Sequence, residues 1–139
     1  MLLLDAHAWI WAVEGDVRRV GPRSRRLIAQ AEARDALRVS PATLFEIVAL
    51  HTAGRLRLAL PPERWIEASL ERPGIRVAEL TREVAIDAAF IPRSALPDPL
   101  DRLLVASARQ LGATLLTGDA AVLAYAARTG NVRVHELAR

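Results

Sequence analysis

A chain of 139 residues, of which 52% are hydrophobic and 25% charged, has the length and composition of one globular domain, and we expect residues 1–139 to form it. The chain has no cysteine, which excludes disulfides and thiolate metal sites. No apolar run approaches the roughly 18 residues needed to cross a bilayer, so no membrane-spanning segment is expected.

The basic residues and the first residues of the chain restrict its class further. All 19 basic residues are arginine, and the net charge is +3. A P-loop requires lysine, and aspartyl-phosphate enzymes normally use one, so both classes are disfavoured. The arginines fit two interpretations that can hold together, the codon bias of a GC-rich genome and a phosphate-binding surface.

Residues 1–5 lack the basic region of a signal peptide, so we expect a cytoplasmic protein.

Short apolar strands alternate with helices in the first half of the chain. Ser40-Pro41 is a strong helix start, because a capping hydroxyl is followed by proline in the first turn. Ser24 or a neighbour is expected to cap an earlier helix. We expect strands at Leu2–Leu4 and Leu37–Val39, and helices over residues 6–14, 24–34 and 41–54.

The second half of the chain continues this alternation. Leu58–Leu60 is expected as a short edge segment. Thr81, Asp98 and Asp119 are expected at helix starts, and Gly112 at a helix end. We expect strands at residues 75–78, 114–116 and 131–135, and helices over residues 63–71, 82–90, 99–111 and 120–128.

This alternation predicts an α/β fold with a central, mostly parallel sheet of four to five strands and helices on both faces. In such folds ligands bind in a crevice outside the carboxyl ends of the strands. Asp5 directly follows the first expected strand, and Asp119 follows the strand at residues 114–116. If these two strands are neighbours, both carboxylates reach one crevice.

Three further acids occupy apolar surroundings. Glu46 shares a helix face with Thr43 and Leu50, and Asp98 and Asp101 begin an apolar helix. Carboxylates that are brought together repel each other unless protons or cations neutralise them. Mg²⁺ or Mn²⁺ is the economical neutraliser, because hard divalent cations prefer oxygen ligands.

Asp5 and Glu46 each have a structural alternative to a role in a metal site. An aspartate at the end of the first strand has no evident cap to make before Ala6, which favours a functional role for Asp5. Glu46 could instead pair with Arg55, but the apolar sequence around it favours a functional role.

The acids of the later helices have stronger structural alternatives. Asp98 and Asp119 are natural N-caps, and Asp101 would interact favourably with the helix dipole in a first turn. We favour Asp101 as the third acid of the metal site and treat Asp98 as a helper. Arg102 is equally suited to contacting a substrate phosphate and to balancing the acids. Thr43 and Thr117 either hydrogen-bond the carboxylates or are packed hydroxyls.

The remaining aromatic and histidine residues are assigned structural roles. Trp9 and Trp11 are interpreted as core residues rather than base-stacking platforms, and Trp65 as a packing residue of its helix. His7 is interpreted as structural or partner-facing rather than as a metal ligand.

Five segments, in the right order and with compatible spacing, resemble the PIN-domain ribonucleases, specifically the VapC toxins of bacterial toxin–antitoxin pairs. The resemblance covers nearly the whole chain. The five segments are Leu-Leu-Asp5-Ala-His7 with Trp11, Ser40-Pro-Ala-Thr43-Leu-Phe-Glu46-Ile47, Gly54-Arg-Leu-Arg-Leu58, Asp98-Pro-Leu-Asp101-Arg-Leu-Leu-Val-Ala106 and Leu116-Thr117-Gly-Asp119.

Three positions depart from the family pattern. Ala6 replaces a usual threonine, Phe45 replaces a common tryptophan, and residues 92–97 lack a frequent histidine pair. These changes concern substrate preference and metal geometry, whereas all the expected acids are present.

The resemblance implies a Mg²⁺- or Mn²⁺-dependent endoribonuclease in which Asp5, Glu46, Asp101 and Asp119 hold one or two metal ions. Asp98 is a further candidate ligand, and Thr43, Arg102 and Thr117 are candidate supporting residues. Hydrolysis of RNA by this route would leave a 5′-phosphate and a 3′-hydroxyl.

The same resemblance implies a homodimer held by a cognate VapB-like antitoxin, and an arginine that this antitoxin inserts into the acidic site. Two alternatives stay open, a housekeeping PIN nuclease and an inactive PIN module that only binds RNA or protein. The sequence does not identify the RNA.

Overall fold

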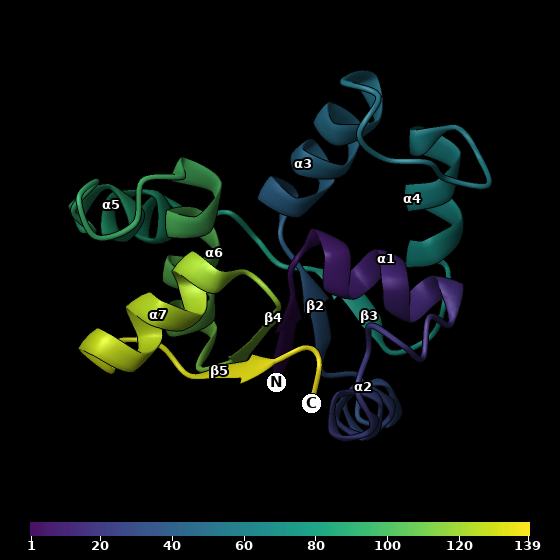
Figure 1. The fold of residues 1–139 in the computed structure, drawn as a ribbon, viewed down its shortest axis with the longest axis horizontal. Helices are drawn as coiled ribbons and strands as arrows, with labels where there is room; N and C mark the ends of the chain where they lie inside the picture. Colours follow the sequence, from purple (N-terminus) through teal and green to yellow (C-terminus); the bar gives the residue numbers. More distant parts are fainter.

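Five strands form one sheet at the centre of the molecule in the computed structural model, which describes residues 1–139 (Figure 1). Every strand pair is parallel, and the order across the sheet is β3-β2-β1-β4-β5. The predicted α/β fold with a mostly parallel sheet is therefore confirmed, and the sheet is fully parallel. The strands are β1 (Leu2–Leu4), β2 (Leu37–Val39), β3 (Ile75–Val77), β4 (Thr114–Thr117) and β5 (Val134–Glu136).

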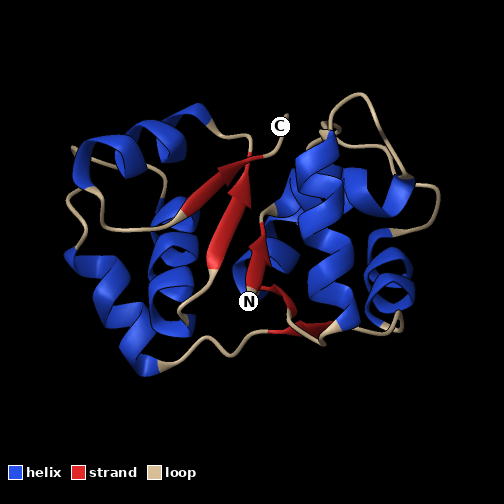
Figure 2. Cartoon of the chain, turned by 90° about the horizontal axis from the view of Figure 1, so that it is seen from below, coloured by secondary structure: helices blue, strands red, loops and turns tan.

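Seven helices cover both faces of this sheet (Figure 2). None of them is long and apolar enough to cross a membrane. They are α1 (Ala6–Glu14), α2 (Pro22–Ala33), α3 (Pro41–Thr52), α4 (Pro62–Leu70), α5 (Arg82–Phe90), α6 (Pro99–Leu111) and α7 (Ala120–Thr129).

The central strand β1 contributes to the hydrophobic cores on both faces of the sheet. Leu2 and Leu4 join a core formed with α1, α2 and Trp65 of α4. Leu3, which points the opposite way, joins a core formed with α6 and α7. Side chains alternate between the two faces along a strand, so a strand with helices on both sides is apolar throughout. Burial on both faces explains the uninterrupted run of three leucines.

Two local predictions are wrong. Leu58–Leu60 forms no strand, and residues 55–58 have no regular secondary structure. Ser24 does not cap α2, because that helix begins earlier, with Gly21 as N-cap and Pro22 in its first turn. Ser24 is instead fully buried, and its hydroxyl donates a hydrogen bond to the carbonyl of Leu137, 2.9 Å away.

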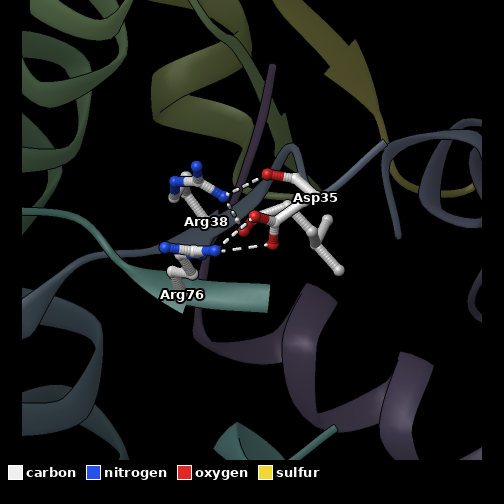
Figure 3. Close-up of polar contacts among 4 residues, drawn as sticks. Asp35, Arg38 and Arg76 are labelled. Atoms are coloured by element: carbon white, nitrogen blue, oxygen red, sulfur yellow. Dashed lines mark hydrogen bonds and ion pairs between the residues drawn. The ribbon is translucent and has the colours of Figure 1, made fainter. Parts of the chain in front are cut away.

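An ion pair ties the turn before β2 to β3 (Figure 3). Arg38 and Arg76 are direct neighbours on the two strands, where like charges would repel. Asp35 lies between them in the left-handed conformation, with φ +54°. Its carboxylate is 2.6 Å from the Arg76 guanidinium, and its carbonyl accepts a hydrogen bond from Arg38 at 2.9 Å. Two of the 19 arginines therefore have a structural role.

The strand order reverses direction at β1. The chain moves outward from β1 to β2 and β3, and then returns to place β4 on the other side of β1. Leu4, the last residue of β1, lies beside Leu116 of β4, so the two strands end within one residue of each other. A reversal of this kind opens a crevice at the carboxyl ends of the strands, where α/β proteins bind ligands.

Candidate functional site

Asp5 lies at the carboxyl end of β1 and is only 9% exposed. One carboxylate oxygen accepts a hydrogen bond from the backbone N–H of Ala8 at 2.8 Å, which makes Asp5 the N-cap of α1. The expectation that Asp5 has no cap to make is therefore wrong. The other oxygen accepts a hydrogen bond from the Thr117 hydroxyl at 2.5 Å. Burial raises the pKa of Asp5 above its usual range, although these two hydrogen bonds oppose the shift.

Thr117 and Asp119 lie at the end of β4. The Thr117 hydroxyl, which donates to Asp5, accepts a hydrogen bond from the backbone N–H of Asp119 at 3.0 Å. Asp119 caps α7 by accepting a hydrogen bond from the N–H of Val122 at 3.0 Å. A single buried hydroxyl thus links the acids that follow the two central strands.

Glu46 of α3 and Asp101 of α6 face these aspartates across the cleft. The pKa of Glu46 is raised to about 7, chiefly by burial and then by the negative charges of Asp5, Asp98 and Asp119. The pKa of Asp101 is also raised to about 7, chiefly by burial and then by the charge of Asp119 and the other acids. None of the ion pairs in the structure includes Glu46, so the alternative of a pair with Arg55 is wrong.

These four acids line one cleft of about 340 Å³ at the reversal in strand order. They come from four separate segments of the chain, the ends of β1 and β4 and the helices α3 and α6. The complete lining is Asp5, Ala6, His7, Trp11, Glu46, Asp101, Leu104, Gly118, Asp119 and Ala120.

Four predicted site residues lie outside this lining: Thr117, which is described above, and Asp98, Thr43 and Arg102. Asp98 caps α6 through a 2.9 Å hydrogen bond from the N–H of Leu100, and its charge contributes to the raised pKa values of Glu46 and Asp101. Thr43 is fully buried, and its hydroxyl has no hydrogen-bond partner. The Nε of Arg102 is also buried without a partner. Neither residue contacts a carboxylate of the cleft through these atoms.

The chemistry of the cleft fits a hard divalent cation. Carboxylate oxygens are the preferred ligands of Mg²⁺ and Mn²⁺, and a cation would relieve the repulsion that helps to raise the two pKa values to about 7. No three acidic or histidine side chains stand close enough together to hold an ion in their present positions. Binding therefore requires side-chain movement or bridging water.

His7 and Trp11 are the aromatic residues of this lining, and the sequence assigned them other roles. Their rings are 5.0 Å apart on α1, and the Arg19 guanidinium lies 4.7 Å from the centre of the Trp11 ring. Trp9 is buried and packs edge-on against Trp65, as predicted. Residues two positions apart on a helix point in nearly opposite directions, so Trp11 could not share this burial. The two-residue spacing of Trp9 and Trp11 was therefore the signal in the sequence that Trp11 lies outside the core position of Trp9.

Comparisons with known proteins identify the family. Residues 2–128 match the PIN domain family. The chain is 34% identical over 119 residues to "Ribonuclease VapC22" of Mycobacterium tuberculosis, a match that covers 85% of this chain and 86% of that protein. The fold of this chain is also similar to that of chains in solved structures. One is VapBC2 from Rickettsia felis bound to a promoter DNA fragment, with a TM-score of 0.66 and 15% identity over 97% of each chain. Another is VapBC-1 from nontypeable Haemophilus influenzae, with a TM-score of 0.66 and 16% identity over 99% of this chain and 98% of that one. With the family match spanning nearly all of the sequence, the chain belongs to the PIN domain family.

Proposed function

We propose that this protein is a metal-dependent endoribonuclease that acts as the toxin of a toxin–antitoxin pair. One observation carries the proposal: carboxylates from four separate segments, Asp5, Glu46, Asp101 and Asp119, line a single cleft at the strand-order reversal. Several partly buried acids within one cleft are unfavourable for stability alone, and perturbed carboxylates in a cleft are typical of catalytic sites. The similarity to a protein named a ribonuclease supports RNA as the substrate.

Mg²⁺ or Mn²⁺, held by these four acids, would supply positive charge that activates water and stabilises developing negative charge on the phosphate oxygens. The residues of the chain have complementary tasks. Glu46 and Asp101, whose pKa values are about 7 without a cation, would be ionised by the bound ion and would hold it through their carboxylate oxygens. Thr117 orients Asp5 and the start of α7. Asp98 adds negative charge beside the site and caps the N-terminus of α6.

The partner proposal depends on the solved complexes. Structures of similar fold contain VapBC pairs, which supports a VapB-like antitoxin as the partner of this chain. We further propose a homodimer. An antitoxin arginine placed in the acidic cleft would compete with the metal, because both neutralise the same carboxylates.

The decisive experiment compares Asp5→Asn with Asp35→Asn. Asparagine keeps the capping oxygen of Asp5 but removes the charge, so the fold should persist while cleavage falls about 100-fold or more. Asp35 is an exposed, ion-paired aspartate outside the cleft, and its substitution should leave cleavage unchanged. The purified proteins are incubated with cellular RNA in Mg²⁺, Mn²⁺ or EDTA, and the fragments are sequenced with their 5′-phosphates identified.

Discrete, EDTA-sensitive fragments that disappear only with Asp5→Asn would support the nuclease and identify its target. Equal cleavage by a well-folded Asp5→Asn variant, or cleavage that persists in EDTA, would contradict it. Binding of RNA without cleavage would favour the inactive module. Expression of the same two variants in a bacterial host tests the toxin role, since only the variant that retains cleavage should slow growth.

A further inference from the structure

On the side of α1, the wall of the acidic cleft is aromatic rather than acidic. His7 and Trp11 are one helical turn apart on this helix, and both line the cleft that contains the four acids. His7 is exposed and Trp11 is partly exposed. The two rings lie 5.0 Å apart with an interplanar angle of 44°. The exposed His7 ring and the exposed part of the Trp11 ring therefore offer aromatic surface beside the carboxylates.

The guanidinium of Arg19, which is outside the cleft lining, extends this wall beyond Trp11. Asp16 accepts hydrogen bonds from the backbone N–H groups of Arg18 and Arg19, at 3.1 and 3.2 Å, and so shapes the turn after α1. Its carboxylate also lies 3.7 Å from Nε of Arg19. The turn holds the Arg19 guanidinium 4.7 Å from the Trp11 ring centre, while the Arg19 side chain stays 60% exposed. The wall thus passes from His7 through Trp11 to an accessible positive charge.

The charge around the cleft makes such a wall useful to a nuclease. The four acids repel a phosphate backbone, so affinity for RNA must come from groups beside them. Proteins that bind single strands combine aromatic rings, on which bases stack, with cations that contact phosphates. The segment from Arg18 to Arg26 carries five arginines and no acid. Arg19, which contacts Trp11, belongs to this basic segment.

We propose that His7, Trp11 and Arg19 form a subsite for a nucleotide that flanks the scissile phosphate, with an unpaired base stacked on the His7–Trp11 rings and a phosphate on Arg19. This inference rests on the proposed function and specifies its substrate as single-stranded RNA at that position. A paired base keeps its faces within the duplex, so a duplex cannot fill the subsite.

The test pairs changes in the protein with changes in the RNA. A short single-stranded RNA that contains one cleavage site is prepared with a single abasic nucleotide at each position in turn. One abasic position beside the scissile bond should lower kcat/KM of the wild-type protein about tenfold or more, which corresponds to the loss of one stacked base. Trp11→Ala should lower kcat/KM by a similar factor and become insensitive to that same abasic position.

Milder variants guard against a folding defect, because Trp11 also packs against the hydrophobic core. Trp11→Phe should keep most of the sensitivity to the abasic position, and His7→Ala should lose part of it. Arg19→Ala should weaken binding and reduce its dependence on salt concentration. Arg64→Ala is the matched control, since Arg64 of α4 is exposed, belongs to no ion pair or aromatic contact, and lies outside both the cleft lining and the basic segment.

Binding is measured separately by fluorescence anisotropy with the same labelled RNAs in an Asp5→Asn background. Binding that depends on Trp11 and on one abasic position, in a protein whose wild type cleaves nothing, would retain the subsite and reject the nuclease. Cleavage with binding that is indifferent to Trp11, His7 and Arg19 would overturn the subsite and retain the nuclease. A protein that neither binds nor cleaves the RNA would overturn both.

Discussion

Thr117 uses its single hydroxyl as both donor and acceptor. It donates to the Asp5 carboxylate and accepts from the backbone N–H of Asp119, and it is 1% exposed. Both interactions are at the carboxyl ends of the neighbouring strands β1 and β4. This hydroxyl therefore positions one acid directly and the backbone of another.

Replacing Thr117 with valine tests this role, because valine matches the shape of threonine and cannot hydrogen-bond. The Thr117 hydroxyl lowers the pKa of Asp5, so its removal should raise that pKa and move the acidic limb of the pH–rate profile to higher pH. Cleavage at neutral pH should fall about tenfold, and the free energy of unfolding should fall by about 1–2 kcal/mol. Thr117→Ser should restore both.

Thr52→Val is the control for this substitution. Thr52 is exposed at the end of α3 and donates only to the carbonyl of Ala49. Its replacement should leave the pH–rate profile in place. An unchanged profile for Thr117→Val as well would mean that the hydrogen bond to Asp5 has no catalytic consequence.

At the scale of single residues, the sequence predicted chemistry better than it predicted contacts. The strand-end positions of Asp5 and Asp119 were evident from the apolar runs before them. The capping role of Asp5 was missed, because α1 begins directly after β1 and leaves no loop to signal the junction. The hydroxyl of Thr117 could be identified as a candidate, but its partner is 112 positions away.

Among the secondary-structure elements, the turn between α4 and β3 has the strictest requirement. Gly74 adopts φ +89°, which disfavours other residues. A Cβ atom there would lie 2.3 Å from the backbone oxygen of Glu32 in α2. The Gly74 carbonyl also accepts a hydrogen bond from the N–H of Leu37 at the start of β2. One glycine therefore permits α2, β2 and β3 to meet.

Gly74→Ala should lower the free energy of unfolding by about 3 kcal/mol or more, since backbone strain and a backbone clash add together. Gly54→Ala is the matched control, because Gly54 also has a positive φ of +72° but nothing lies within 4 Å of its Cβ position. That control should lose only about 1 kcal/mol. Urea denaturation measures both, and equal losses would show that the close approach to Glu32 is relaxed in solution.

Most helix and strand positions were predictable because each has a local signal. Ser40-Pro41, Thr81 and Gly112 have the cap roles that their chemistry suggested. The edge segment predicted at Leu58–Leu60 was wrong because apolar side chains indicate burial but not strand pairing. Leu58 packs against the core without a strand partner. The role of Ser24 depends on the distant Leu137, which no local pattern reveals.

For the whole molecule, the acidic cleft makes stability depend on pH. Burial and the neighbouring acids raise the pKa of Glu46 from its ordinary value of 4.5, and that of Asp101 from 3.8, to about 7 in the folded protein. The folded state therefore holds these protons more tightly than the unfolded state. Their contribution to stability is complete below about pH 4 and is lost as the pH rises through about 7.

Without divalent metal, the free energy of unfolding should accordingly fall between about pH 4 and 7 because of these two groups. Glu46→Gln should flatten this dependence and stabilise the protein at about pH 8 by roughly 1–3 kcal/mol, a value reduced by partial solvent exposure. Added Mg²⁺ should raise the melting temperature of the wild-type protein more at about pH 8 than at about pH 5, since it binds ionised carboxylates. Equal metal effects at both pH values would contradict this account.

The topology was only partly predictable at this scale. The alternation of strands and helices indicated a parallel sheet, but strand order depends on which strands pair across the chain. The crevice was predicted on the condition that the strands preceding Asp5 and Asp119 are neighbours, and their pairing fulfils that condition. The wall of His7, Trp11 and Arg19 was not foreseen, because it needs the turn after α1 to fold back over the helix.

The position of β1 between β2 and β4 has a consequence for synthesis of the protein. β1 is synthesised before the other strands of this sheet and is central in it, yet one of its two neighbours begins only at residue 114. A growing chain that lacks β4 leaves that edge of β1 unpaired and lacks Asp119. Translation proceeds from the N-terminus, so the four-acid cleft forms only after β4 and Asp119 have been synthesised. We therefore expect a nascent chain that ends before residue 114 to cleave no RNA.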